Sequence, residues 1–246
     1  MSIDFADVSR VRRLRLFFAG CALVLLYTAF LGRYGVLQQT EARYAEVARE
    51  MKVSRDFLMP TLNGVPHVQK PPVAYWLTAG SMALFGENEI GARVPALLAG
   101  LGTLVLTAWI GTMWFNRRIG LLSLIILSGA AEFYVLSRSL CADMIMTFWS
   151  TAAIAAFAFA TRRKAQSSVW RFAPFFVFMG IAFATKGPMG IVVPLCASGA
   201  WQLHGRRQGG LARRSRGAPG WRLLSPWRRP GSSRWPGDIR TCGATS

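Results

Sequence analysis

The stretch VPALLAGLGTLVLTAWIGTMWF, residues 94–115, carries no charged side chain and decides the class of the protein. A helix needs about 20 consecutive apolar residues to cross the hydrocarbon core of a bilayer, and this stretch provides them. Similar apolar blocks, several of them slightly shorter, cover residues 16–31, 119–136, 144–161, 172–185 and 187–203. The sequence therefore predicts an all-α polytopic membrane protein with about six spans. A soluble protein with a buried core is the alternative.

The chain is strongly basic, with a formal charge of +18, although 52% of its 246 residues are hydrophobic. The basic residues form short clusters between the apolar blocks, which is typical of cytoplasmic loops rather than of a nucleic-acid-binding surface. Only the segment after Leu203 could be interpreted as a nucleic-acid patch. The cysteines Cys21, Cys141, Cys196 and Cys242 include no pair with the spacing of metal ligands.

The run VAYWLTAGSMALF, residues 73–85, decides the topology, because as a helix it would be only about 20 Å long and too short to cross. We expect it to lie on the membrane surface or to re-enter it. The basic clusters then all fall on one side of the membrane, at residues 10–15, 117–118, 162–164 and 206–207. The positive-inside rule accordingly places both termini in the cytoplasm and makes residues 32–93 one long external loop.

The stretch QTEARYAEVAREM, residues 39–51, lies in this external loop and predicts a helix on the membrane surface. We expect its N-terminal tip to project Glu41 and Arg43, with Glu46 and Glu50 on its solvated face. The alternative is that Glu41 only complements the helix dipole. Apolar side chains recur at i, i+3, i+4 and i+7 and form one stripe, which consists of Tyr44, Val47, Ala48 and Met51.

Charged residues gather on the external side of this topology, at or near the membrane surface. They are Glu41, Arg43, Lys70, Arg138, Asp143 and Lys186. Charges at that depth are costly unless they are paired or line a water-filled cavity. The sequence ATKGPMG also places Lys186 at a break between two apolar runs, where unpaired backbone groups favour a cavity. The group is therefore predicted to form a site.

Each of these residues also has a plainer interpretation. Lys70 could be a lysine that reaches the lipid headgroups, and Asp143 could cap the helix that begins beside it. Glu132 is a candidate partner for Arg138. His67 is expected to be a turn residue rather than a metal ligand, and Asn63 with the following glycine predicts a tight turn.

From residue 205 onward the composition changes to arginine, glycine, proline, serine and tryptophan, without another apolar block. One interpretation is a disordered basic cytoplasmic tail. The other, which we favour, is that the segment is read out of frame from a point near Gly209. Either way, the sequence predicts a membrane domain over residues 1–205 and a separate basic tail over residues 206–246.

Several stretches of the chain resemble, in the right order and spacing, landmarks of one family. They are EARYAEVAREM, LNGVPHVQKPPVAYWL with the following LFGENEIGARVPALLAG, SRSLCADMIMTFW and ATKGPMGIVVP. The family is that of the bacterial polyprenyl-phosphate-dependent glycosyltransferases of the protein mannosyltransferase superfamily, which has the GT-C fold. The greatest similarity is to the undecaprenyl-phosphate aminoarabinose transferases that modify lipid A. The resemblance covers residues 14–205.

The resemblance implies a multi-pass protein of the bacterial inner membrane that moves a sugar from a polyprenyl-phosphate donor to a periplasmic acceptor, such as lipid A or another glycan. It implies an external carboxylate near the acceptor hydroxyl, which could act as a general base. It also implies basic residues that stabilise the departing phosphate. The family continues through further helices, a periplasmic loop and usually a soluble domain, so the chain is expected to be an N-terminal part of such a transferase, and whether that part is active on its own stays open.

The family's functional positions can be carried over to this sequence. Glu41 and Asp143 are the expected catalytic acids, and Thr40 stands where the family has an aspartate. Gln69 stands where the aminoarabinose transferases have a metal-binding acid, so no metal site and no certain cofactor are expected. The expected substrate-binding residues, including Arg138 from the topology, are Arg43, Tyr44, Lys70, Arg138 and Lys186. The alternative function is a non-catalytic membrane carrier or accessory protein that binds a lipid phosphate.

Overall fold

The computed structural model describes residues 5–33, 35, 39–162 and 169–215. Apart from one short hairpin, every regular element in these segments is a helix. The elements are α1 (Phe5–Thr28), α2 (Gln39–Ser54), β1 (Thr61–Leu62), β2 (Val65–Pro66), α3 (Val73–Phe85), α4 (Glu89–Trp114), α5 (Arg117–Ser128), α6 (Ala131–Arg138), α7 (Ala142–Arg162), the 3-10 turn η1 (Val169–Phe172), α8 (Ala173–Lys186) and α9 (Met189–Ser215). The prediction of an all-α polytopic membrane protein is confirmed.

Among the described residues, fewer helices are long and apolar enough to cross a membrane than the sequence predicted. Within the described segments, α4, α7 and the stretch Val169–Lys186 are long and apolar enough, and α5 with α6 would make a fourth span. The expected first and last spans appear as shorter apolar helices, Phe18–Thr28 and Met189–Leu203. Their continuous helices extend into charged sequence, so only part of each is apolar.

The predicted span at residues 119–136 is broken. α5 ends at Ser128, α6 begins at Ala131, and the two axes differ by 70°. A Ser-Gly pair, Ser128-Gly129, stands at the break, and such pairs are a common cause of sharp kinks. The broken backbone is held by α1, because the hydroxyl of Tyr27 donates to the carbonyl of Ser128 at 3.0 Å. The ring of Tyr27 also packs edge-on against Tyr134, whose hydroxyl donates to Leu26 of α1 at 3.3 Å.

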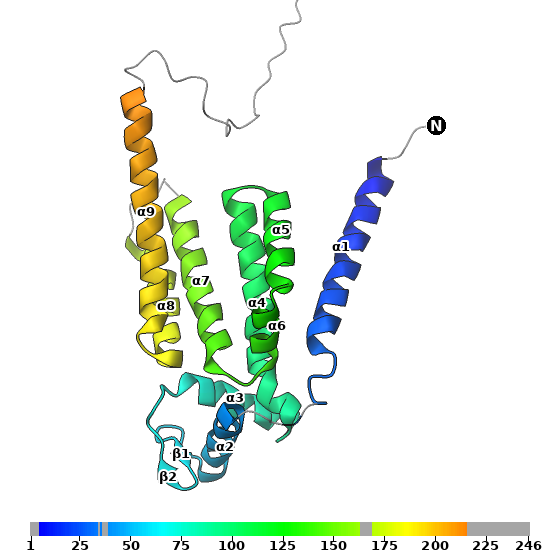
Figure 1. The fold of residues 1–246 in the computed structure, drawn as a ribbon, viewed down its shortest axis with the longest axis vertical. Coiled ribbons are helices and arrows are strands. Elements are labelled where there is room, and N and C mark those ends of the chain that lie inside the picture. Colours follow the sequence, from blue (N-terminus) through cyan, green and yellow to red (C-terminus); the bar gives the residue numbers. More distant parts are fainter. Residues whose placement is uncertain (1–4, 34, 36–38, 163–168, 216–246) are drawn as a thin grey trace, which may run out of the picture. The chain divides into compact units, whose positions relative to one another are not determined.

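α4, α5, α7 and α8 run side by side in Figure 1, with α4 against α5 and α7, and α7 against α8. α2, the hairpin and α3 lie together at one end of these helices (Figure 1). The connection between α4 and α5 and the C-terminal end of α7 lie at the other end. The length of α3 predicted that it does not cross the membrane, and α3 accordingly lies at the end of the long helices and not alongside them.

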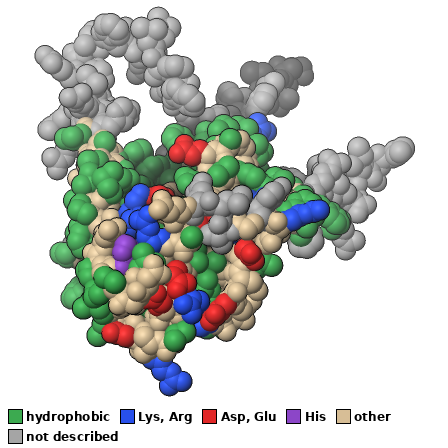
Figure 2. Space-filling view, turned by 60° about the horizontal axis from the view of Figure 1, so that its bottom comes forward, with side chains coloured by type: hydrophobic (Ala, Val, Ile, Leu, Met, Phe, Trp, Pro, Cys, Tyr) green, Lys and Arg blue, Asp and Glu red, His purple; other side chains and the backbone are tan. Residues whose placement is uncertain are grey.

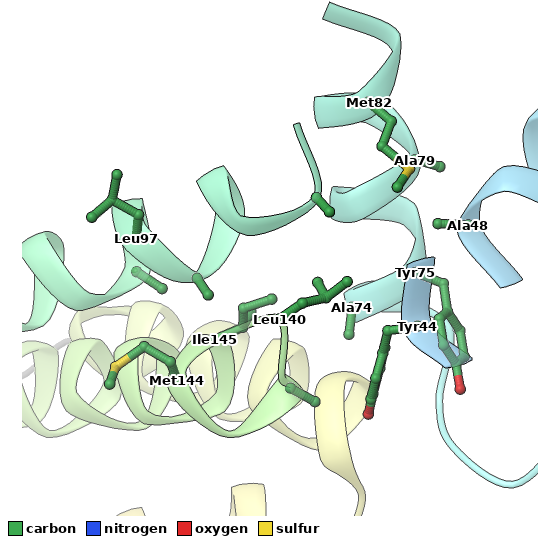
Figure 3. Packing of buried hydrophobic residues seen from close by; sticks show 14 of the residues in the cluster. Tyr44, Ala48, Ala74, Tyr75, Ala79, Met82, Leu97, Leu140, Met144 and Ile145 are labelled. Carbon is green, nitrogen blue, oxygen red and sulfur yellow. The ribbon is translucent and has the colours of Figure 1, made fainter. Parts of the chain in front are cut away.

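The predicted apolar stripe of α2 is confirmed, because its four members are all buried. The stripe packs on α3 and belongs to one buried core with residues of α4 and the start of α7, part of which Figure 3 shows. The rings of Tyr44 and Tyr75 lie 5.0 Å apart at its centre. Fully burying one apolar side chain of this size stabilises the fold by about 1.5–3 kcal/mol, so the stripe is sufficient to fix α2 against α3.

The hairpin confirms the turn predicted at Asn63-Gly64, where both residues have positive φ, 54° and 74°. Two central residues with positive φ are typical of the tight turns that match the twist of a hairpin. Glu50 of α2 holds this turn, and its carboxylate accepts from the Thr61 hydroxyl at 2.5 Å and from the Asn63 amide at 2.6 Å. Glu50, expected on the solvated face, is half-buried and is engaged by the hairpin through these bonds. Glu46, by contrast, pairs with Arg49 at the surface.

The chain divides into two units, residues 1–200 and 201–246. The helix α9 continues through Ser215, so the first residues of the expected basic tail are helical. The rest of that tail, from residue 216, lies outside the described residues.

Candidate functional site

Four segments converge at the end of the helices where α2 and α3 lie. They are the start of α2, the residues just before α3, the turn between α6 and α7, and the end of α8. Figure 2 looks onto this end and shows acidic and basic side chains gathered among apolar ones. Most of the site residues predicted from the sequence lie on these segments.

Asp143 and Lys186 form an ion pair between the first turn of α7 and the last residue of α8. Gly187 ends α8 with a φ of 88°, a conformation that only glycine adopts without strain, and the chain turns away directly after the lysine. The two side chains are 41% and 34% exposed. A pair this exposed is worth about 0–1 kcal/mol, so either group can exchange its partner for a ligand at little cost.

Lys70 lies over the face of the Tyr44 ring, with its ammonium nitrogen 5.0 Å from the ring centre. The electron-rich ring face attracts the cation and fixes its position. Tyr44 is only 4% exposed, and its hydroxyl has no hydrogen-bond partner among the described residues. Burial raises the pKa of Tyr44 to about 12, so this hydroxyl keeps its proton and remains a donor at physiological pH.

Cys141 links these groups electrostatically. Burial raises the pKa of its thiol, the nearby Glu41 adds to that effect, and the positive charges of Lys186 and Lys70 oppose it. Three charged groups, from α2, α8 and the segment before α3, therefore act electrostatically on the same thiol. Arg43 joins them from the α2 side, where its charge partly offsets the raised pKa of Tyr44 and of Tyr75.

The sequence predicted that Glu41 projects from the tip of α2. In the structure Glu41 is instead buried, with only 5% of its surface exposed. One carboxylate oxygen accepts from Arg93 of α4 at 3.1 Å. The other accepts from the backbone amide of Leu140 at 2.8 Å. Helix α2 packs its first turn against protein, because the stripe that includes Tyr44 pulls that turn inward.

Arg138 lies apart from the other candidates. Its guanidinium donates to the hydroxyl of Tyr134 and to the backbone carbonyl of Ala29, at the end of α1. Within the described segments no ion pair joins it to Glu132, so that expected pairing is wrong. Arg138 fixes α6 to α1 in this structure.

The structure also describes Gln69, which stands at the expected metal-binding position. Gln69 is exposed. Among the residues that the structure describes, no group of three or more His, Cys, Asp or Glu is placed to hold a metal ion. The site therefore consists of two lysines, one arginine, tyrosines and a carboxylate.

Sequence reasoning missed Arg93 and Tyr75. Arg93 is 6% exposed, although it begins the most apolar stretch of the chain. The available signal for a functional role was a charged residue at the edge of such a stretch. The sequence did not reveal its partner, because that partner is distant in sequence. Tyr75 was counted only as part of a short apolar helix.

A cavity of about 680 Å3 lies elsewhere, between α4, α7 and α8. Its walls are mainly aromatic and alanine side chains, with Arg171 as the one charged lining residue. None of the predicted site residues lines it, so the cavity is not part of the charged site.

Comparison with known proteins places this geometry among membrane transferases. Residues 11–224 match the family described as dolichyl-phosphate-mannose-protein mannosyltransferase. A relative in Shewanella sediminis (strain HAW-EB3), named undecaprenyl phosphate-alpha-4-amino-4-deoxy-L-arabinose arabinosyl transferase, is 31% identical over 179 residues, which cover 70% of this chain and 32% of the relative. A protein of the same name in Pseudomonas savastanoi pv. phaseolicola is 30% identical over 193 residues, 76% of this chain and 35% of that one.

A solved structure is similar over most of the chain. It is the crystal structure of ArnT from Cupriavidus metallidurans bound to undecaprenyl phosphate, with a TM-score of 0.71 and 27% identity. The match covers 82% of this chain and 37% of that protein. The chain thus spans about one third of the length of the curated relatives it matches.

Proposed function

This chain belongs to the dolichyl-phosphate-mannose-protein mannosyltransferase family, and from that premise we propose that it acts in moving a sugar from a polyprenyl-phosphate donor to an acceptor at the membrane surface. The donor class is supported by the names of the relatives and by the undecaprenyl phosphate bound to the similar ArnT structure. The acceptor would be a lipid or glycan such as lipid A.

The observation that carries the proposal is the placement of two ammonium groups, Lys70 over the ring of Tyr44 and Lys186 beside the Asp143 carboxylate. In the transfer, the bond between the anomeric carbon and the phosphate oxygen breaks, and the phosphate takes the electron pair. Two ammonium groups in a partly buried site stabilise that developing negative charge more strongly than water does. The hydroxyl of Tyr44, which has no partner in the part of the chain that the structure describes, is the neutral donor that would complete the phosphate contacts.

The acceptor hydroxyl must lose its proton as it attacks the anomeric carbon. Asp143 is the carboxylate that fits this role, because it is partly exposed and its partner Lys186 can turn to the phosphate when the donor binds. Glu41 does not fit it, since both its oxygens already accept hydrogen bonds inside the protein. Attack from the side opposite the phosphate inverts the anomeric carbon.

We place the site on the periplasmic side of the inner membrane, with both termini in the cytoplasm. The support is the distribution of charge: α5, which begins with Arg117 and Arg118, starts at the end of the helices opposite α2 and α3, and in the sequence a basic cluster directly follows α7, whose C-terminal end lies there too. Residues 1–205 would form the transferase domain and residues 206–246 a separate basic tail.

The test is sugar transfer by the chain in proteoliposomes that contain undecaprenyl phosphate carrying a radiolabelled sugar, with lipid A as acceptor. We expect Lys70→Ala and Asp143→Asn to abolish labelling of the acceptor while the protein still inserts. Lys52→Ala is the control, because Lys52 pairs with Glu87 on the surface of the same region. Full transfer by both site variants would contradict the assignment.

A second function, binding of a lipid phosphate without transfer, is favoured by one observation. Thr40 stands beside Glu41 where the resemblance calls for an aspartate, and Glu41 itself is engaged internally. In the same proteoliposomes, donor that is retained by the protein while no acceptor is labelled would establish this function.

A further inference from the structure

Arg93 is a charged side chain buried at the start of α4. Its guanidinium donates to the carbonyl of Leu31 at 2.9 Å and to the carbonyl of Gly35 at 3.1 Å, which are the residues leading from α1 toward α2. It also donates to Glu41 at 3.1 Å, in an ion pair whose two side chains are each 7% exposed. Charges removed from water in this way are costly unless paired and hydrogen-bonded, as these are.

The second carboxylate oxygen of Glu41 connects this pair to a third segment. It accepts from the amide of Leu140 at 2.8 Å, in the turn between α6 and α7. Cys141 is the next residue, and α7 begins at Ala142, so Asp143 lies in the first turn after the held amide. The chain of contacts therefore runs from α4 through α2 to the segment that presents Asp143.

We propose that Arg93 is a positioning residue, which acts through Glu41 to hold the turn at Leu140 and thereby sets the place of Asp143 opposite Lys186. The inference rests on the proposed function only for the role of Asp143. The network itself touches neither the Lys186 ammonium nor the Lys70 ammonium among the described contacts.

A role in positioning the turn explains the Arg93–Glu41 pair better than a contribution to the stability of the fold does. A buried ion pair often contributes no more to stability than apolar side chains of the same volume, whereas removing one partner strands the other charge. The pair joins three segments that are far apart in sequence, with Glu41 and Arg93 separated by 52 residues and Glu41 and Leu140 by 99. A pair that only stabilised could be replaced by apolar side chains without consequence for the turn.

The thiol of Cys141 reports on that turn. It is half-buried, and its sulfur lies 3.8 Å from the carbonyl of Leu136. In the full chain with its other cysteines changed to serine, we would measure the rate at which a maleimide labels Cys141. We expect Arg93→Met to raise this rate at least tenfold, and Lys52→Met, which breaks a surface pair, to leave it unchanged.

Because Arg93→Met alone could destabilise the whole fold, the variant that tests the proposal is the double variant Arg93→Met with Glu41→Met. It removes both charges and restores apolar packing, and we expect a thermal midpoint close to that of the parent protein with Cys141 still labelled fast. Equal labelling rates in the parent and in the stable double variant would overturn the proposal.

Binding of undecaprenyl phosphate separates this inference from the proposed function. If Lys70→Ala and Lys186→Ala both leave that binding unchanged, the proposed function fails, and the labelling experiment still decides the role of Arg93. If those lysines matter, the double variant should bind the lipid with near-parent affinity and lose sugar transfer, because Asp143 is displaced while both ammonium groups stay in place. A double variant that transfers at the parent rate would also overturn the positioning role.

Discussion

The ammonium group of Lys70 lies 5.0 Å from the centre of the Tyr44 ring, whose own hydroxyl is buried without a hydrogen-bond partner in the described part of the chain. One tyrosine thus combines a ring face that holds the lysine with a buried hydroxyl that has no partner among the described residues. These two contributions can be separated by substitution.

Tyr44→Phe keeps the ring and removes the hydroxyl. A buried polar group without a partner costs about 1–3 kcal/mol, so we expect the variant to be more stable than the parent by about 1 kcal/mol. We also expect it to bind undecaprenyl phosphate severalfold more weakly. Thermal unfolding and lipid binding in the same detergent measure the two effects. A Tyr44→Phe variant that binds the lipid as the parent does would remove the hydroxyl from the site.

The two lysines should account for most of the phosphate affinity. A hydrogen bond between charged partners contributes about 1.5–3 kcal/mol, so Lys70→Ala and Lys186→Ala should each weaken binding of undecaprenyl phosphate by at least about tenfold. The dependence of binding on salt should also become shallower. Lys52→Ala should change neither quantity, and if it weakens binding as much, the effect is one of general surface charge.

Stability at alkaline pH should report on Tyr44. Burial raises its folded-state pKa to about 12 from 10.0. Between these two values the unfolded chain loses the proton and the folded chain keeps it, so the stability contributed by the protonated group is complete below pH 10 and is lost as pH rises toward 12. Burial raises the pKa of Tyr75 as well, in the same direction. The unfolding midpoint followed from pH 10 to 12 should fall less steeply in Tyr44→Phe than in the parent.

The hairpin should depend on Glu50. Its carboxylate accepts from the amides of Asn63 and Gly64 and from the Thr61 hydroxyl. Glu50→Ala should lower the free energy of opening the hairpin by about 1–3 kcal/mol, which faster hydrogen exchange at residues 61–66 would reveal. Glu46→Ala is the matched control, because the exposed pair of Glu46 with Arg49 contributes about 0.2–1 kcal/mol. Equal exchange in both variants would contradict the role of Glu50.

The local features of this fold were predictable because they depend on neighbouring residues. The stripe containing Val47 and Met51 follows helical spacing, and both residues are buried. The length of α3 alone indicated that it does not span. The turn at Asn63-Gly64 follows from the backbone preferences of those two residues.

The contacts that organise the site could not be predicted in this way. Whether Glu41 is solvated or buried depends on Arg93, 52 residues away, and no local pattern distinguishes the two cases. The same holds for Arg138, whose partner Ala29 directly follows the first helix. The Ser-Gly pair was a local signal for the break between α5 and α6. The prediction of one unbroken span followed instead from the uninterrupted hydropathy of residues 119–136.

The contact between Tyr27 and Ser128 has a consequence for how the protein is made. The two residues are separated by 101 positions, so α1 leaves the ribosome and enters the bilayer long before the carbonyl that it must cap has been synthesised. Domains and helices are delivered in chain order during synthesis. The first helix must therefore exist as an independent segment until α5 and α6 have been synthesised, and only then can its contact with Ser128 form.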